Sequence, residues 1–237
     1  MLNRSVIKAY DELANDYEHH VDQRSFYNTE YERPAMIKEL PRSVSNLNVL
    51  DAGCAAGWYT CELIRHGAIV TATDISQNMV DATKRRVGEK ATVVCLDLAE
   101  ELPFENSSYD LIISSLVLHY LKDWKSTFKE FNRILKPGGK LLFSVHHPSM
   151  DVRLSKEGNY FSHELIVDEW TRDGKIIEVP FYRRPMQTIL NETLQYFKLE
   201  KIIEPQPTEE FKKRDSSGYQ KLKKAPHFLI IQASKHG

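Results

Sequence analysis

The chain has 237 residues, of which 41% are hydrophobic and 27% are charged, which is enough apolar material for one substantial core and predicts a single globular unit. Its 32 lysines and arginines nearly balance its 33 aspartates and glutamates, so it lacks the positive field that non-specific nucleic-acid binding needs, and we expect no nucleic-acid partner. The chain shows no secretory leader and no long apolar span, which predicts a cytoplasmic protein without membrane insertion.

The first part of the chain is a polar segment dotted with aromatic residues. From Tyr10 to about Pro41 it is expected to be helical in pieces, and it is too polar to form a domain alone. We interpret residues 1–41 as a cover over the main domain. Tyr10 and Tyr17 could close over a ligand or pack against the sheet, and the sequence leaves both interpretations open.

The stretch from Asn48 to Gly57 runs from a short apolar strand into small residues and then into a helical pattern. Small residues let the backbone turn sharply and approach a ligand closely. The helix that follows offers unpaired N–H groups and the positive end of its dipole. This pattern is typical of a loop that cradles a nucleotide.

From Val49 to Ser144, short apolar runs alternate with amphipathic stretches. This rhythm predicts repeated strand–helix units, a parallel sheet and helices on both of its faces. Asp74 closes the strand at 69–73, and Asp97 closes the strand at 92–96. Loops at the carboxyl ends of successive parallel strands would line one crevice.

Two helices and a turn are expected inside this region. The first helix follows Ser76, a good N-cap, and stops at Gly88. The second begins near Asp123 and has an apolar face at helical spacing. The residues of that face are Trp124, Phe128, Phe131 and Leu135. Residues 136–139, Lys-Pro-Gly-Gly, predict a turn that reverses the chain into a strand at 140–145.

The remaining chain divides into an insert and a return to the core. Residues 147–184 break the strand–helix rhythm, and the four residues 172–175 indicate a hairpin. Inserts at this position commonly shape a substrate pocket. Residues 185–237 resume the core, and within them the polar stretch 205–226 is expected to be a solvated loop or a mobile segment. The core elements expected there are a helix at 185–196 and strands at 199–203 and 228–233.

The cysteines Cys54, Cys61 and Cys95 have no metal-type spacing, and no metal site is predicted. Cys61 on a helix and Cys95 in a buried strand are expected to pack in the interior. Cys54 lies in the loop of small residues, where nothing nearby lowers a thiol pKa, so we expect no nucleophilic role.

Five motifs in order resemble those of class I S-adenosylmethionine-dependent methyltransferases, the broad group acting mostly on small molecules. The motifs are the acidic and glycine-rich run Asp51 to Gly57, Asp74, the pair Asp97-Leu98, the strand and its exit at 109–119, and the turn at 135–139. The run departs from the family pattern because Ala55 replaces its middle glycine. One methyl group fits there unless the backbone needs a positive φ.

The resemblance implies a doubly wound, Rossmann-like α/β fold. Its sheet would have seven strands, mostly parallel with an antiparallel last strand and helices on both faces, and residues 42–146 would form the cofactor-binding core. It also implies S-adenosyl-L-methionine as cofactor and S-adenosyl-L-homocysteine as product. The implied cofactor-binding residues are Tyr17, Asp51, Gly53, Cys54, Ala55, Gly57, Trp58, Asp74, Ile75, Met79, Asp97, Leu98, Ser114, Ser115 and Leu116.

Residue chemistry supports several of these roles. A carboxylate only accepts hydrogen bonds, so Asp74 can accept two from ribose hydroxyls. Asp97 would accept from the adenine amino group, with Ile75 and Leu98 around the ring. Main-chain groups of Gly53 and of the two serines would hold the methionine end. The alternative for Asp74 and Asp97 is helix or turn capping.

Methyl transfer from a sulfonium is an in-line displacement that depends mainly on positioning and on exclusion of water. A base is required only when the acceptor must lose a proton. Candidates near the predicted rim are His119, placed first, then His146, His147 and Tyr182, and for each a merely packed or solvent-facing side chain is the alternative. The expected partner is a small organic methyl acceptor, bound by a monomer or a homodimer.

Other functions stay open at this point. A nucleic-acid or protein methyltransferase could share the fold, although the strand exit at 114–117 lacks an Asn/Asp-Pro-Pro-Tyr type motif. An NAD-dependent oxidoreductase is disfavoured because the loop from Gly53 to Gly57 is compressed relative to a Gly-x-Gly-x-x-Gly fingerprint. A regulator that binds S-adenosylmethionine without turnover is a further possibility.

Overall fold

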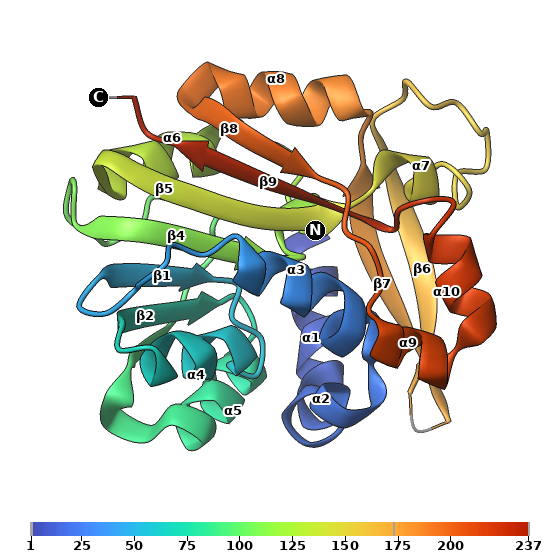
Figure 1. The fold of residues 1–237 in the computed structure, drawn as a ribbon, viewed down its shortest axis with the longest axis horizontal. Helices are drawn as coiled ribbons and strands as arrows, with labels where there is room; N and C mark the ends of the chain where they lie inside the picture. The colour runs from blue at the N-terminus through green and yellow to red at the C-terminus, as the bar shows by residue number, and fades with distance from the viewer. Residues whose placement is uncertain (1, 173, 237) are drawn as a thin grey trace.

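A seven-stranded sheet lies at the centre of the protein, and the computed structural model describes residues 2–172 and 174–236 (Figure 1). Along the sheet the strands follow the order β3-β2-β1-β4-β5-β9-β8. They are β1 (Asn48–Ala52), β2 (Ile69–Asp74), β3 (Thr92–Cys95), β4 (Tyr109–Ser115), β5 (Leu135–His146), β8 (Lys198–Ile203) and β9 (Phe228–Ser234). Strand β9 pairs antiparallel with β5 and β8, and the other neighbouring pairs are parallel. The fold class expected from the sequence is confirmed.

Helices cover both faces of this sheet, because successive side chains of a central strand point to opposite faces and both sets are buried. On one face Leu50 and Ile112 pack against α6 and α8. On the other face Val49 and Ile113 pack against α3 and α4. These helices are α3 (Arg33–Lys38), α4 (Trp58–Arg65), α6 (Lys125–Ile134) and α8 (Met186–Tyr196).

Helix α5 (Gln77–Val87) has the ends that the sequence predicts. The Ser76 hydroxyl accepts the N–H of Met79 at 3.2 Å and so caps the first turn. Gly88, at φ +59°, ends the helix and starts a short 3-10 turn, η2 (Gly88–Lys90). These local signals fix where the helix lies after β2.

The junction of α6 and β5 differs from the prediction. The helix ends at Ile134, and Leu135 already belongs to β5, where it pairs with Tyr109. The expected turn at 136–139 is the irregular start of that strand, since the register between β4 and β5 shifts at this point. Leu135 therefore packs in the core from a strand and not from the helical face predicted for it.

The N-terminal segment is helical in pieces, as expected. Its elements before α3 are α1 (Leu2–His19), α2 (Val21–Arg24) and the π-helix η1 (Asn28–Glu32). Helix α1 lies between α5 and a second, two-stranded sheet formed by residues 164–172 and 175–183, and it contacts both (Figure 1). The segment thus covers one end of the central sheet.

The polar stretch 205–226 is ordered into two short helices, and the expectation of a solvated loop or mobile segment is wrong. The helices are α9 (Glu209–Arg214) and α10 (Ser216–Leu222). Phe211 is fully buried and meets the rings of Phe26 and Tyr27 edge-on, with ring centroids 5.0 and 5.2 Å away. Burial of one aromatic side chain anchors an otherwise polar segment.

The insert contains α7 (Pro148–Asp151) and the predicted hairpin, formed by β6 (Glu164–Arg172) and β7 (Lys175–Arg183). Asp173 at its tip lies outside the described residues. The 3-10 turn η3 (Leu118–Tyr120), which follows β4, packs against β7. The division of the chain into four domains or parts stays a prediction.

The three cysteines occupy different environments. Cys54 is buried and Cys61 is half-buried, but Cys95 is exposed, so the expectation that Cys95 packs in the interior is wrong. It ends β3, which is an edge strand with one neighbour. Burial raises the pKa of the Cys54 thiol well above its usual value, so this group stays protonated.

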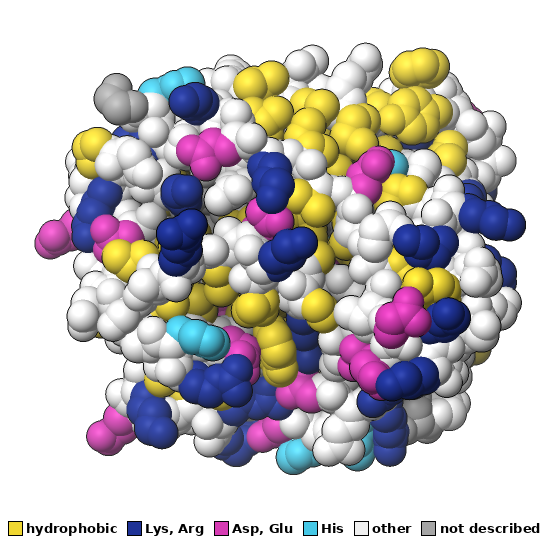
Figure 2. Space-filling model, viewed as in Figure 1, with side chains coloured by type: hydrophobic (Ala, Val, Ile, Leu, Met, Phe, Trp, Pro, Cys, Tyr) yellow, Lys and Arg dark blue, Asp and Glu magenta, His cyan; other side chains and the backbone are white. Residues whose placement is uncertain are grey.

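Acidic and basic side chains are interspersed on the face shown in Figure 2, and no block of one sign dominates it. This agrees with the formal net charge of -1. Among the described residues, no helix is both long and apolar enough to traverse a bilayer.

Candidate functional site

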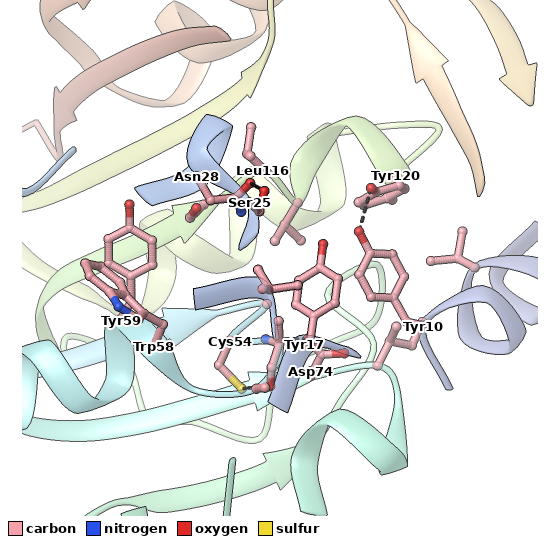
Figure 3. Close-up of a pocket in the computed structure, with 18 of the residues that line it drawn as sticks. Tyr10, Tyr17, Ser25, Asn28, Cys54, Trp58, Tyr59, Asp74, Leu116 and Tyr120 are labelled. Atoms are coloured by element: carbon pink, nitrogen blue, oxygen red, sulfur yellow. Dashed lines mark hydrogen bonds between the residues drawn. The ribbon is translucent and has the colours of Figure 1, made fainter. Parts of the chain in front are cut away.

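A cavity of about 360 Å³ runs along the carboxyl edge of the parallel strands (Figure 3). The sheet order places Asp97, which follows β3, and Asp74, the last residue of β2, toward one end of the cavity, which we call the acidic end. The other end, which we call the aromatic end, lies over β5 and β9. Its residues are Tyr120, His146, Trp170, His227 and Phe228. One hollow therefore joins two chemically different surfaces.

The loop after β1 lies between the two ends, and its backbone explains its small residues. Gly53 has φ +88°, and a Cβ placed there would lie 2.2 Å from a methyl group of Val117. Gly57 has φ +79° and caps α4, although it does not itself line the cavity. Glycine at Gly53 lets the main chain form the wall of the cavity, as a close approach to a ligand requires.

Ala55 also has a positive φ, +46°, which is the condition under which its methyl group adds strain to the family pattern. Its N–H donates to Asp74 at 2.9 Å, and its carbonyl accepts from Thr83 at 2.6 Å. These bonds hold the residue in a left-handed conformation that costs a side-chain-bearing residue roughly 1–2 kcal/mol.

We expect Ala55→Gly to raise the free energy of unfolding by about 0.5–1 kcal/mol, since relief of this strain exceeds the extra chain entropy of glycine. Urea unfolding measures it. The matched control is Ala56→Gly, at a buried neighbour with no positive φ, which should lower stability. A loss of stability in both variants would contradict the strain.

Asp74 presents a carboxylate to the acidic end. Its two oxygens accept the backbone N–H groups of Ala55 and Ser76, both at 2.9 Å, which fixes the carboxylate plane and leaves lone pairs facing the cavity. Burial raises its pKa to about 6. Asp97 accepts the N–H of Ala99 at 2.9 Å and the side-chain amide of Asn3 from α1. Both residues can accept hydrogen bonds from a ligand.

Asp51 does not reach the cavity. It is buried beneath the loop, where the Thr60 hydroxyl donates to it at 2.6 Å. Burial, with a smaller contribution from the charge of Asp74, raises its pKa to about 7. The predicted direct role in cofactor binding is therefore replaced by support of the loop from below.

The raised pKa of Asp51 predicts a pH dependence of stability. An unfolded aspartate has a pKa near 4, so the folded state holds the proton more tightly than the unfolded state does. The ionised, buried carboxylate therefore lowers the stability of the folded state above pH ~7, and this loss of stability fades as the pH falls toward ~4. We expect Asp51→Asn to raise the unfolding free energy of the ligand-free protein by about 2–4 kcal/mol at pH 8 and by much less at pH 5. Urea unfolding at the two pH values tests this, and an equal change at both would contradict it.

Helix α1 covers the acidic end with two tyrosines. The Tyr10 hydroxyl donates to the Tyr120 hydroxyl, a bond drawn in Figure 3, at 2.6 Å. The ring centroids of Tyr10 and Tyr17 lie 5.9 Å apart. Burial raises the pKa of all three phenols, which therefore stay protonated. Tyr10 and Tyr17 line the cavity and pack on a cluster formed by α1, α5 and residues of the insert, and closure of their rings over a ligand stays a prediction.

Glu32 is a buried residue near the site that the sequence does not point to. This carboxyl is fully buried in η1 and accepts hydrogen bonds from the hydroxyls of Tyr59, Ser115 and Ser144, at 2.8, 2.8 and 2.6 Å. Burial raises its pKa, and these donors offset part of that shift. A lone acidic residue in a polar segment gave no signal of such a position.

Most of the residues implied for cofactor binding meet in this one cavity. Those that line it are Tyr17, Gly53, Cys54, Ala55, Trp58, Asp74, Ile75, Asp97, Leu98, Ser115 and Leu116. Asp51, Gly57, Met79 and Ser114 do not line it. Met79 packs in the core, and the Ser114 hydroxyl donates to the carbonyl of Ala52 at 2.9 Å, so these two are placed to support the site.

None of the three catalytic candidates lines the main cavity. His119 is 2% exposed behind the aromatic end, and burial lowers its pKa well below the usual value, so it is neutral and out of reach. His147 caps α7 and also pairs with Glu204 at 3.0 Å. Tyr182 lines a separate small cavity with His119. The position expected for His119 at the rim is wrong, and His146 takes it.

The aromatic end also holds residues that the sequence did not single out, above all His227 and Phe228 at the start of β9. These lie there because β9 runs antiparallel, so its first residues reach the carboxyl edge of the other strands. Trp170 comes from β6 and donates its indole N–H to Asp168 at 2.8 Å. The insert thus lines the cavity, as expected from its place in the chain.

The sequence profile of the methyltransferase domain family matches residues 50–143. A candidate S-adenosylmethionine-dependent methyltransferase of Listeria monocytogenes, known from its crystal structure, is 28% identical, with a TM-score of 0.74 over 87% of this chain and 97% of that one. A malonyl-[acyl-carrier protein] O-methyltransferase of Priestia megaterium is 32% identical over 61% of this chain and 53% of its own length. A ubiquinone biosynthesis O-methyltransferase of Coxiella burnetii is 31% identical over 47% and 50%. The chain therefore spans about half the length of these curated relatives.

The cavity fits S-adenosylmethionine, the cofactor named for the Listeria monocytogenes protein. Asp74 and Asp97 offer acceptors for hydroxyl and amino groups, and the cradle at Gly53 has no room for a side chain. Residues 50–143 match the methyltransferase domain family, and this range includes the loop after β1, Asp74 and Asp97, which line the cavity.

Proposed function

We propose that this protein transfers the methyl group of S-adenosylmethionine to an oxygen atom of a small organic acceptor. The observation that carries the proposal is a single cavity that joins an acidic end, suited to a nucleoside, with an aromatic end that is suited to an organic acceptor. The similarity to two O-methyltransferases, one named for malonyl-[acyl-carrier protein] and one for ubiquinone biosynthesis, supports oxygen as the atom methylated.

The roles of the residues follow from their positions. Asp74 would accept the ribose hydroxyls, and Asp97 the adenine amino group, with Ile75 and Leu98 around the ring. The main chain at Gly53 and the groups of Ser115 would hold the amino-acid half. When bound, S-adenosylmethionine supplies an activated methyl group on a positively charged sulfur. The protein contributes alignment and, through α1, exclusion of water.

The test is incubation with S-adenosylmethionine that carries a deuterated methyl group, together with a panel of hydroxyl, carboxyl, amine and thiol compounds. Mass spectrometry should find the label on oxygen, with S-adenosylhomocysteine formed in equal amount. Calorimetric titration with S-adenosylhomocysteine and with NAD accompanies it. Binding of NAD alone, or label only on nucleic acid, would contradict the proposal. Tight S-adenosylhomocysteine binding without any product would favour a non-catalytic regulator.

A further inference from the structure

His146 is the imidazole that the structure places at the wall of the main cavity with a carboxylate behind it. It is the last residue of β5, and its side chain is 14% exposed. Its Nδ1 lies 3.3 Å from Oδ1 of Asp151, whose side chain is 4% exposed. Among the described residues, neither of these two atoms has a hydrogen-bond partner. Their separation is already within hydrogen-bond range, so a rotation that aligns the ring N–H with Oδ1 would join them, as often happens when a ligand binds.

The surroundings fix the orientation of the ring. His119 stacks on it, with centroids 4.0 Å apart and planes inclined by 19°, and Phe181 meets it edge-on at 4.7 Å. Asp151 is held at the end of α7, where its N–H donates to the carbonyl of His147 at 3.1 Å. The Nδ1 edge therefore faces a buried carboxylate. Nδ1 of His146 is a buried polar atom without a partner, whereas Nε2 is not one of these atoms.

Other groups near the aromatic end are less suited to take a proton. The phenol of Tyr120 stays protonated because burial raises its pKa, and Asp168 already accepts the indole N–H of Trp170. His227 has a pKa lowered by burial, and the described residues give it no carboxylate within ion-pair distance. The charged groups behind His146 are Asp151 and Arg184, which shares the small second cavity with it.

We propose that His146, oriented by Asp151, removes a proton from the acceptor, and that the acceptor is an aromatic compound with a hydroxyl group. This rests on the proposed function and narrows its substrate class. A carboxylate acceptor has no proton to lose at neutral pH, so a histidine–carboxylate pair would give it no advantage, whereas a phenol must be deprotonated. The rings of Tyr120, Trp170 and Phe228 provide an apolar, aromatic surface for such a compound.

The step balances as follows. The hydroxyl proton moves to Nε2 of His146, the new O–C bond forms, and the C–S bond that breaks leaves its electron pair on sulfur. The charge that develops on the imidazole is then stabilised by Asp151, which is a positioning residue because it acts through His146.

The test uses 4-nitrophenol, whose anion absorbs at longer wavelength than its neutral form. We expect the compound bound to the wild-type protein to be ionised at a pH about one unit below that needed in buffer, because the imidazole takes its proton. His146→Gln should remove this shift, and Asp151→Asn should remove most of it. His163→Gln, at a histidine that does not line the main cavity, should keep it. A shift that survives His146→Gln, or no binding of 4-nitrophenol to the wild type, would overturn the proposal.

Two measurements keep this result separate from folding and from the donor site. Calorimetry with S-adenosylhomocysteine on each protein shows whether the donor site is intact, and its failure in the wild type would defeat the proposed function whatever 4-nitrophenol does. Nitrogen-15 NMR of the wild type gives the tautomer of His146 without any variant. The proton is expected on Nδ1, facing Asp151, and a neutral ring with its proton on Nε2 would also overturn the proposal.

Discussion

Asp74→Ala is expected to weaken the binding of S-adenosylhomocysteine about 10- to 100-fold, because hydrogen bonds to a charged group contribute roughly 1.5–3 kcal/mol. The substitution also removes the acceptor for the N–H groups of Ala55 and Ser76, which shape the loop. Calorimetry measures the change. The matched control is Asp110→Asn, whose carboxylate also accepts a backbone N–H, from Asn48 at 2.9 Å, but lies outside the cavity. Equal affinity of the Asp74 variant and wild type would remove Asp74 from the site.

The pKa of the same carboxyl adds a pH dependence to this result. The value is about 6 in the ligand-free protein, and the ionised form is the one that accepts from two hydroxyls. Affinity for S-adenosylhomocysteine should therefore fall as the pH drops below about 6, by up to about tenfold per pH unit. Asp74→Asn should bind more weakly at pH 8 and lack this dependence. A wild-type affinity that is constant from pH 8 to pH 5 would mean that Asp74 does not bind the ligand as its anion.

Gly53→Ala is expected to abolish measurable donor binding and to destabilise the protein by about 2–4 kcal/mol. Two costs add at this position, namely a left-handed backbone at φ +88° and a Cβ that would lie 2.2 Å from Val117. Either the loop or Val117 must move, and both line the cavity. Urea unfolding and calorimetry with S-adenosylhomocysteine measure the two effects.

Two further variants separate these costs. Gly88→Ala also has a positive φ, +59°, with ψ −136°, but its new Cβ would meet no atom within 4 Å, so it should lose about 1–3 kcal/mol from backbone strain alone and bind the donor normally. The double variant Gly53→Ala with Val117→Ala removes the collision and should recover part of the lost stability. If the double variant is no more stable than Gly53→Ala, the collision with Val117 is not the cause.

The sequence predicted the sheet and the acidic end of the cavity because both depend on local signals. Apolar runs, the cap at Ser76 and carboxylates at strand ends are readable within a few residues, and parallel strands bring their ends to one edge. The backbone at Ala55 is not readable in this way. A residue identity does not reveal that hydrogen bonds to Asp74 and Thr83 hold it at a positive φ.

The aromatic end was harder to predict because chain positions near a strand exit do not show which side chain faces the cavity. His119 follows β4 in the turn η3 and packs inward, whereas His146 ends β5 and reaches the cavity. His227 joins them only because the last strand runs in the opposite direction. The segment 205–226 was misjudged for a related reason, since one buried side chain, Phe211, outweighs its polar composition.

Glu32 ties the start of the chain to the middle of the sheet. The three hydroxyls that donate to it come from α4, from the end of β4 and from β5, and releasing them would leave a buried carboxyl without partners. Residues 28–38 should therefore open together with the sheet, and amide hydrogen exchange would give both the same slow rate. Helix α1, held at its outer side by the exposed Glu18–Arg85 pair, should exchange sooner. The segment thus combines a part that is expected to unfold with the core and a helix that is expected to exchange earlier.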